Sequence, residues 1–390
     1  MQKSQQINIH NPVVAIFISF VICYIFYYFI PTFYVTQNMG YFEGVPRANV
    51  LGIDYTATLQ MAIDEFSIPY SPFVKLLFGF FAKYSFTSSY YFITALTIAA
   101  TVGSYYLIYQ LYRPKEISAF AFFLTFSIVS YGFLFEIERG QWNIIAIFFV
   151  LLAIYWSRKG YFYLAVLFFA ISVSLKLYPL VFAPALIQDF SRKGRVVFKS
   201  LVILFSNLFL FLIMGISYFN WYLRIITKYA EIKSTWVGNH SISSFGILLE
   251  VEWAKYLVFI LYLVLLLVFL VILYRKNQES IGAHFLCVLA IGACIVPSVS
   301  HDYKLSILDF FIPIIFMKYD STSTRQSIVR FLIVLFYFSI HYSYVNFYYI
   351  DYQLIYCKIV FLIPLIILIF VDYLLLEYPG TKTLEEPIQA

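Results

Sequence analysis

Long apolar runs alternate with short polar segments along the whole chain. A helix needs roughly 20 apolar residues to cross a bilayer, and fewer where other helices surround it. The pattern therefore predicts an all-α, polytopic membrane protein that forms a single transmembrane domain over residues 1–390. About twelve transmembrane helices are expected, near residues 12–34, 89–111, 117–136, 142–157, 161–175, 177–188, 197–217, 253–274, 283–298, 305–317, 328–347 and 353–374.

The composition agrees with lipid as the main solvent. Hydrophobic residues make up 62% of the chain and charged residues 12%, whereas soluble domains are about 25% charged. The net charge of +6 does not indicate a nucleic-acid partner, because the basic residues lie in short clusters between apolar runs. Membrane lipids are the expected surroundings instead.

Lysine and arginine set the expected orientation. Basic residues are enriched in cytoplasmic segments, and a cytoplasmic N-terminus places every tight cluster there, with mostly single charges outside. We expect a multi-pass protein of the plasma (inner) membrane. The clusters are Arg113 and Lys115, Arg158 and Lys159, the four basic residues of 192–199, Arg275 and Lys276, and the three basic residues of 318–330.

Two long segments then lie on the outer side, at about residues 35–88 and 218–252. The first contains Tyr55–Phe66, which is amphipathic, and Phe73–Tyr84, which is apolar with two lysines that can reach the headgroups. We expect both pieces to lie along the membrane surface. Together these outer segments are predicted to cover an active site.

The unusual polar residues fall in five separate stretches that this topology places on one side. Ionisable groups at membrane depth are costly and usually functional. A mixture of carboxylates, imidazoles and cations suits a reaction at an anionic leaving group. The residues are Asp54; Arg139, Gln141 and Asn143; Lys176; Asn239 and His240; and His301, Asp302 and Lys304.

Each stretch also has a purely structural explanation. Independent structural causes, however, would not place all five on the same side of the membrane. The alternatives are a helix cap at Asp54, an ion pair between Glu138 and Arg139, a snorkelling Lys176, turn-fixing amides at Gln141 and Asn143, a plain loop at Asn239 and His240, and a helix cap at His301 and Asp302.

Several kinds of chemistry are absent from the sequence. There is no glycine-rich phosphate loop, no HExxH and no GxSxG. No Asp-x-Asp pair is present to grip a nucleotide-sugar through a metal, and Glu136-x-Glu138 is the nearest substitute. We expect no cofactor and require no metal, although assistance by a divalent ion at Glu136 and Glu138 stays open. An enzyme that transfers a sugar must therefore take it from a donor already in the membrane.

The order of these motifs resembles the glycosyltransferase C superfamily, and most closely glycosyltransferase family 87, the polyprenyl-phosphate-mannose-dependent mannosyltransferases. The resemblance is clearest over residues 50–315. It rests on Asp54 in the first outer segment, followed by GQWN at 140–143, SLKLYP at 174–179, GNHSI at 238–242 and SHDYKL at 300–305.

The resemblance implies a fold like that superfamily's and an inverting transfer at the outer face. The partners would be a polyprenyl phosphate sugar donor, with mannose favoured, and a glycolipid or glycan acceptor. Asp54 would be the general base on the acceptor hydroxyl. The remaining residues divide into a donor-phosphate group of Lys176, Arg139, Lys304 and His301, and a substrate-binding group of Gln141, Asn143, Asn239, His240 and Asp302.

Departures from the family pattern leave the sugar and the acceptor undetermined. The family's Tyr-Pro-Pro is replaced by Pro69-Tyr70-Ser71-Pro72, Trp142 follows Gln141, and His240 stands where glutamine is commoner. Two other functions remain open. A transporter or lipid flippase would place its charges near the bilayer midplane and contain repeats, and a polymerase would use an oligosaccharide on a diphosphate lipid.

Overall fold

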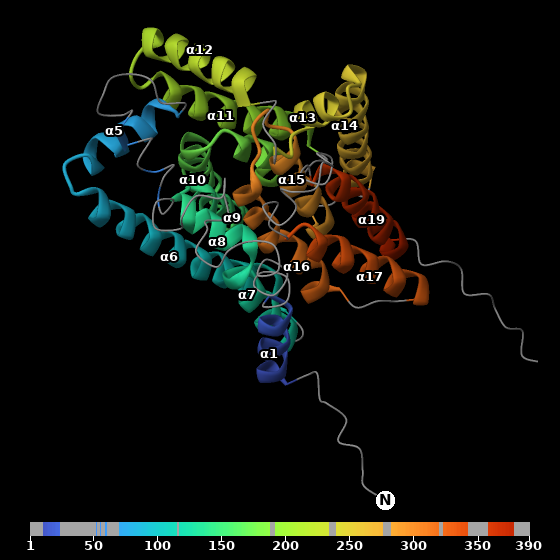
Figure 1. Ribbon diagram of the computed structural model, residues 1–390. Coiled ribbons are helices and arrows are strands. Elements are labelled where there is room, and N and C mark those ends of the chain that lie inside the picture. The colour runs from blue at the N-terminus through green and yellow to red at the C-terminus, as the bar shows by residue number, and fades with distance from the viewer. Residues whose placement is uncertain are drawn as a thin grey trace, which may run out of the picture.

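The protein is helical throughout the part of the chain that the computed structural model describes (Figure 1). No strand occurs in these ranges, so the prediction of an all-α chain is confirmed there. The described residues are 11–23, 52, 55, 59–60, 70–114, 117–187, 192–233, 239–275, 282–319, 323–341 and 358–377.

Five helical segments in the described ranges are long and apolar enough to cross a bilayer. A membrane protein with several spans is thereby supported, whereas the number twelve stays a prediction. The five are α6 (Phe86–Tyr112), the stretch Ile117–Arg139 that comprises α7 (Ile117–Val129) and α8 (Tyr131–Arg139), α11 (Lys193–Leu212), α14 (Glu252–Arg275) and most of α19 (Ile359–Glu377).

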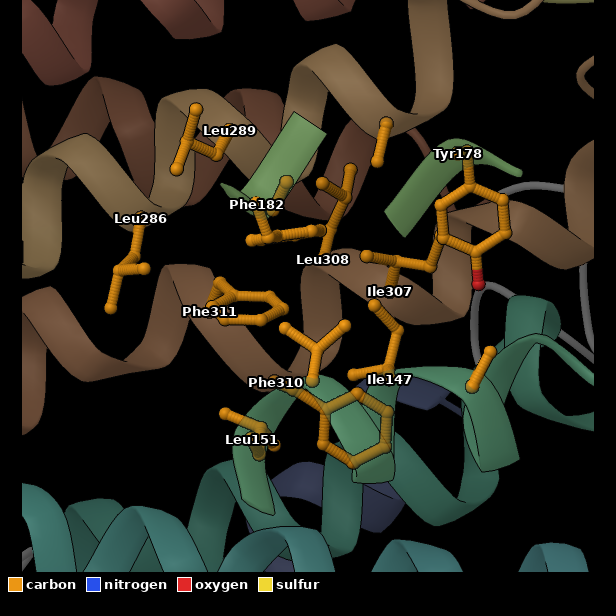
Figure 2. Close-up of a cluster of buried hydrophobic side chains, with 14 of the residues drawn as sticks. Ile147, Leu151, Tyr178, Phe182, Leu286, Leu289, Ile307, Leu308, Phe310 and Phe311 are labelled. Atoms are coloured by element: carbon orange, nitrogen blue, oxygen red, sulfur yellow. The ribbon is translucent and has the colours of Figure 1, made fainter. Parts of the chain in front are cut away.

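Shorter helices fill the middle of the molecule. They include α9 (Asn143–Arg158), α10 (Phe162–Leu175), α15 (Ala283–Ile295) and α16 (Leu308–Lys318), and α15 is buried over its whole length. Figure 2 shows the apolar side chains that α9, α15 and α16 bring together. Because neighbouring helices rather than lipid surround α15, this helix need not match the bilayer thickness.

The segment expected as a helix near 177–188 is a 3₁₀ helix, η2 (Tyr178–Leu186). Pro179 lies in its first turn and Pro184 lies within it, and proline disfavours regular α-helical hydrogen bonding. Its nine residues cover about 18 Å at the 3₁₀ rise of about 2.0 Å per residue, more than an α-helix of equal length. The Phe182 ring stacks on Phe311 of α16, with ring centroids 5.0 Å apart, inside the core of Figure 2.

The long segments expected on the outer side contain helices. In the first, α5 (Pro72–Phe81) agrees with the predicted surface helix 73–84, and Ser71 caps its N-terminus. Of the other predicted piece, Tyr55–Phe66, only Tyr55, Leu59 and Gln60 lie within the described residues. In the second, α12 (Ile216–Lys233) lies alongside α11, and α13 (Ile242–Leu248) packs against α14 (Figure 1).

The junction between α7 and α8 packs against a second junction, where the 3₁₀ helix η3 (Asp302–Ile307) meets α16. The Ser130 hydroxyl accepts a hydrogen bond from the backbone of Phe133 and donates one, 2.8 Å long, to Oδ2 of Asp309. A Cβ atom at Gly132 would lie 2.8 Å from the backbone nitrogen of Ser306. The glycine therefore permits the contact that fixes α8 against η3.

Two of the predicted cytoplasmic clusters meet at one end of the bundle. Arg158 donates a 3.0 Å hydrogen bond to the Tyr112 hydroxyl, and Nζ of Lys318 lies 5.5 Å from the centre of the same ring. We call this the basic end. The turn between α8 and α9 lies at the opposite end of α9 from Arg158, and we call that the site end.

Candidate functional site

Glu136 organises the turn between α8 and α9. Its Oε1 atom accepts hydrogen bonds from the backbone N–H groups of Asn143, at 2.6 Å, and Ile144, at 3.1 Å. Its Oε2 atom accepts one from Nδ2 of Asn143 at 2.8 Å. The first N–H groups of a helix lack partners within it, so Glu136 caps α9, whose own N-cap residue Trp142 makes no side-chain capping bond. The amide nitrogen of Asn143, expected to bind substrate, is therefore engaged with this carboxylate.

Lys176 extends from the end of α10 to the same turn. Its Nζ atom donates to Oε1 of Gln141 at 2.9 Å and to the hydroxyl of Tyr70 at 3.0 Å, and it lies 4.5 Å from the centre of the Tyr70 ring. The neighbouring Ser71 hydroxyl donates to the carbonyl of Ser174. Two residues of the predicted site, Lys176 and Gln141, are thus in direct contact, and the start of α5 is fastened beside them.

Gly52 and Tyr55, two described residues of the first outer segment, also contact this turn. The backbone N–H of Gly52 donates to the carbonyl of Glu138 at 2.6 Å. A Cβ atom at Gly140 would lie 2.7 Å from Cβ of Tyr55. Asp54, the expected base, lies outside the described residues, but its described neighbours on both sides contact residues 138–140.

Gly140 makes this approach possible. It ends α8 with φ +64°, a left-handed conformation that glycine adopts at little cost. The preceding residue, Arg139, is buried, and its guanidinium carbon lies 6.0 Å from the centre of the Phe135 ring. Arg139 is therefore held at the end of α8, directly before the glycine that packs against Tyr55.

Lys304 brings a second ammonium group to this end of the bundle from η3. Its Nζ atom donates to the carbonyl of Val299 and lies 5.4 Å from the centre of the Tyr178 ring. Burial, together with the charge of Lys176, lowers the pKa of Lys304 to about 7. An anion between the two ammonium groups would relieve this repulsion.

His301 is the N-cap residue of η3, in agreement with the structural alternative, although its side chain makes no capping hydrogen bond. It is 6% exposed, and its ring packs edge-on against Tyr303, with centroids 5.6 Å apart. The structure places it three residues before Lys304, at the start of η3.

Asn239 fastens the second outer segment to the strand-like stretch before η3. Its Nδ2 atom donates to the carbonyl of Ser298 at 2.9 Å, and its Oδ1 atom accepts from the backbone N–H of Ser300 at 2.8 Å. The N–H of His240 adds a 2.7 Å bond to the carbonyl of Ser300. These contacts hold the residues before α13 at the site end.

A buried charge network continues from His240. Nε2 of His240 hydrogen bonds to Oδ1 of Asp302, and Nζ of Lys358 lies 3.0 Å from Oδ2 of the same carboxylate. Burial alone would raise the pKa of Asp302, but the Lys358 charge and His240 outweigh it and hold the pKa at about 2. All three side chains are at most 1% exposed. Their hydrogen bonds to one another, rather than contact with a ligand, account for their positions.

Among the residues predicted from the sequence, the structure brings Lys176 into contact with Gln141 and His240 into contact with Asp302, whereas Asp54 lies outside the described residues. The pattern had not marked Lys358 or Tyr70. Lys358 was a single charge at the edge of an apolar run, and Tyr70 was one of 36 tyrosines. An isolated lysine in so apolar a run is the signal that indicates a buried partner.

The described acidic, imidazole and thiol side chains include no group of three spaced to hold a metal ion. Both oxygens of Glu136 are already occupied by hydrogen bonds. Two ammonium groups, those of Lys176 and Lys304, lie at this end of the bundle, so the arrangement is suited to binding and stabilising an anion.

Comparison with known protein families identifies a relationship. The model of glycosyltransferase family 87 matches residues 68–297, more than half of the 390 residues. No curated protein matches the chain. The matched range includes Arg139, Gln141, Lys176 and His240, and it ends shortly before His301.

Proposed function

The chain belongs to glycosyltransferase family 87, and on that premise we propose that it transfers one sugar from a polyprenyl phosphate to a glycolipid or glycan acceptor. Resemblance to the family favours mannose as the sugar. The reaction would take place at the outer face of the plasma membrane, because the positive-inside rule assigns the basic end to the cytoplasm. The site end then opens toward the opposite side.

One observation carries the proposal. Two ammonium groups, those of Lys176 and Lys304, come from segments far apart in the chain and reach the same end of the bundle, where burial and the charge of Lys176 lower the pKa of Lys304. Gly52 and Tyr55, which flank Asp54, are packed against the turn that holds Gln141. An anion site beside a carboxylate is what displacement of a lipid phosphate requires.

The chemistry follows from these positions. The acceptor hydroxyl attacks the anomeric carbon of the donor, the bond from that carbon to the phosphate oxygen breaks, and Asp54 takes the hydroxyl proton. Lys176, Arg139, Lys304 and His301 stabilise the negative charge on the departing phosphate. A positioned base contributes about 10²–10⁴-fold to the rate. The phosphate needs no proton in order to leave, so one carboxylate suffices for an inverting transfer.

Among the other predicted residues, Gln141 is best placed to meet the substrate, because it is bonded to Lys176. We propose that Asn143, Asn239, His240 and Asp302 shape the site from beneath. The Nδ2 atoms of Asn143 and Asn239 donate to protein oxygens, and His240 and Asp302 hydrogen bond to each other.

The test is sugar transfer by the full-length protein in lipid vesicles, with a panel of polyprenyl phosphate sugars as donors. Asp54→Asn is expected to stay folded and to lose transfer, while the outer-segment control Asp64→Asn retains it. Full activity in Asp54→Asn would remove the proposed base. Uptake or flipping of a lipid-linked sugar without transfer would instead favour a transporter.

A further inference from the structure

The ammonium group of Lys358 is buried at the start of α19, next to the carboxylate of Asp302. Nζ of Lys358 lies 3.0 Å from Oδ2 of Asp302 and 4.8 Å from the centre of the Tyr131 ring. Lys358 lies about 60 residues beyond the range that matches the family. The pair joins the start of α19 to η3, which contains Lys304 and begins directly after His301.

His240 completes the arrangement through both of its ring nitrogens. The backbone N–H of Lys358 donates to Nδ1 at 3.1 Å, so Nδ1 carries no proton. The proton of the neutral ring is then on Nε2, which donates to Asp302. Burial lowers the pKa of His240, consistent with a neutral ring. Lys358 is therefore the group that supplies full positive charge to Asp302.

The position of Asp302 makes this charge important. Asp302 is the first residue of η3 and lies in the sequence between His301 and Lys304, which are both proposed to meet the donor phosphate. An unbalanced carboxylate there would repel a phosphate and would attract Lys304 away from it. Charges in a poorly hydrated site interact over greater distances than in water.

We propose that Lys358 is a positioning residue for the donor phosphate: it neutralises Asp302 and fixes η3, so that His301 and Lys304 present positive charge to the lipid phosphate. The inference rests on the proposed function. It adds a residue that touches no substrate and acts through Asp302.

A purely stabilising role for Lys358 makes a different prediction. Loss of a stabilising contact lowers the amount of folded protein and affects both substrates alike. Loss of a charge that serves the phosphate site raises the KM for the donor and leaves the KM for the acceptor nearly unchanged. Removal of both charges separates the two roles further. The double change Lys358→Met with Asp302→Asn leaves no unbalanced charge beside the phosphate site, although the stabilising contact is lost.

The experiment uses the full-length protein in lipid nanodiscs. It compares the wild type with K358M, K358R, D302N and the double variant D302N/K358M. The readouts are direct binding of polyprenyl phosphate, the KM values for donor and acceptor, and the melting temperature. The control is K255M. Lys255 also pairs with an acid near the start of a helix, since its Nζ atom lies 2.9 Å from Oε1 of Glu252, but this pair is not buried.

We expect K358M to weaken polyprenyl phosphate binding and raise the donor KM by about tenfold, in the range of coupling between contacting charges. K358R and the double variant should recover most of the loss, and K255M should match the wild type. An unchanged donor KM in K358M, or a double variant no better than K358M, overturns the inference. If K358M does not fold, the double variant is compared with the wild type instead. A donor KM of the double variant well above that of the wild type then overturns the inference.

Failure of the proposed function gives a separate result. In that case the wild type itself neither transfers sugar nor binds polyprenyl phosphate, and the inference falls with it. If the wild type transfers sugar and binds polyprenyl phosphate, and the Lys358 variants behave like it, only the proposed role of Lys358 is wrong.

Discussion

Nζ of Lys176 lies 2.9 Å from Oε1 of Gln141, although 35 positions separate the two residues in the chain. The first stands at the end of α10 and the second in the turn between α8 and α9. Because Gln141 accepts from Lys176, the ammonium group is held in one place before any donor arrives. Preorganised charge of this kind is the main source of transition-state stabilisation in many enzymes.

Replacement of Lys176 should therefore affect the chemical step. We expect Lys176→Met to reduce kcat by about 10²–10³-fold, the loss typical when one group that stabilises a developing negative charge is removed. Steady-state kinetics with a polyprenyl phosphate sugar provides the measurement. Lys176→Arg keeps the charge and should retain more activity, and equal kcat values in wild type and Lys176→Met would contradict the assignment.

Gly140 should be intolerant of a side chain for two reasons. The left-handed backbone costs about 1–2 kcal/mol for a residue with a Cβ atom, and that atom would lie 2.7 Å from Cβ of Tyr55. We expect Gly140→Ala to lower the melting temperature and to reduce sugar transfer, because Tyr55 directly follows Asp54.

Gly160 is the matched control for this change. It also has positive φ, at +85°, but a Cβ atom there would meet nothing within 4 Å. Gly160→Ala should show the backbone cost alone and keep normal transfer. Equal activity losses in the two variants would mean that backbone strain, not contact with Tyr55, explains the effect.

The activity should depend on pH through Lys304. Its pKa is about 7, so the ammonium form that binds phosphate is present below pH 7 and is lost as the pH rises through that value. We expect kcat/KM for the donor to fall at higher pH, because this ratio reports groups of the free enzyme. Arginine stays charged at all these pH values, so Lys304→Arg should abolish the fall of kcat/KM at higher pH. If kcat/KM of Lys304→Arg still falls at higher pH, another group is responsible for the pH dependence.

Chelation tests whether a divalent metal ion at Glu136 and Glu138 assists the reaction. Both oxygens of Glu136 accept hydrogen bonds from the start of α9, and the lysines supply positive charge near the turn. We expect treatment with EDTA to leave the turnover unchanged. Loss of activity that Mg²⁺ or Mn²⁺ restores would show that a metal takes part.

The apolar pattern predicted the longest helices closely. The expected span 89–111 corresponds to α6 (Phe86–Tyr112), and 253–274 corresponds to α14 (Glu252–Arg275). Side chains that face lipid must be apolar wherever they stand in the chain, so such helices are evident from local sequence alone. The interior spans expected at 142–157 and 161–175 also correspond to α9 (Asn143–Arg158) and α10 (Phe162–Leu175). The exception is η2, which is a 3₁₀ helix where a span was expected. Its conformation depends on its two prolines and on neighbours such as Phe311 that are distant in sequence.

For the site, the sequence by itself determined which polar residues are too costly to lie in a membrane without a purpose, and it indicated that they share one side. Only the tertiary structure decided their partners: Gln141 for Lys176, the start of α9 for Glu136, and Lys358 for Asp302. The cost of burying a charge is a property of the residue and its immediate surroundings in the chain. The identity of the group that compensates it depends on how helices distant in sequence pack together, and the packing here joins α19 to η3 and α10 to the turn after α8.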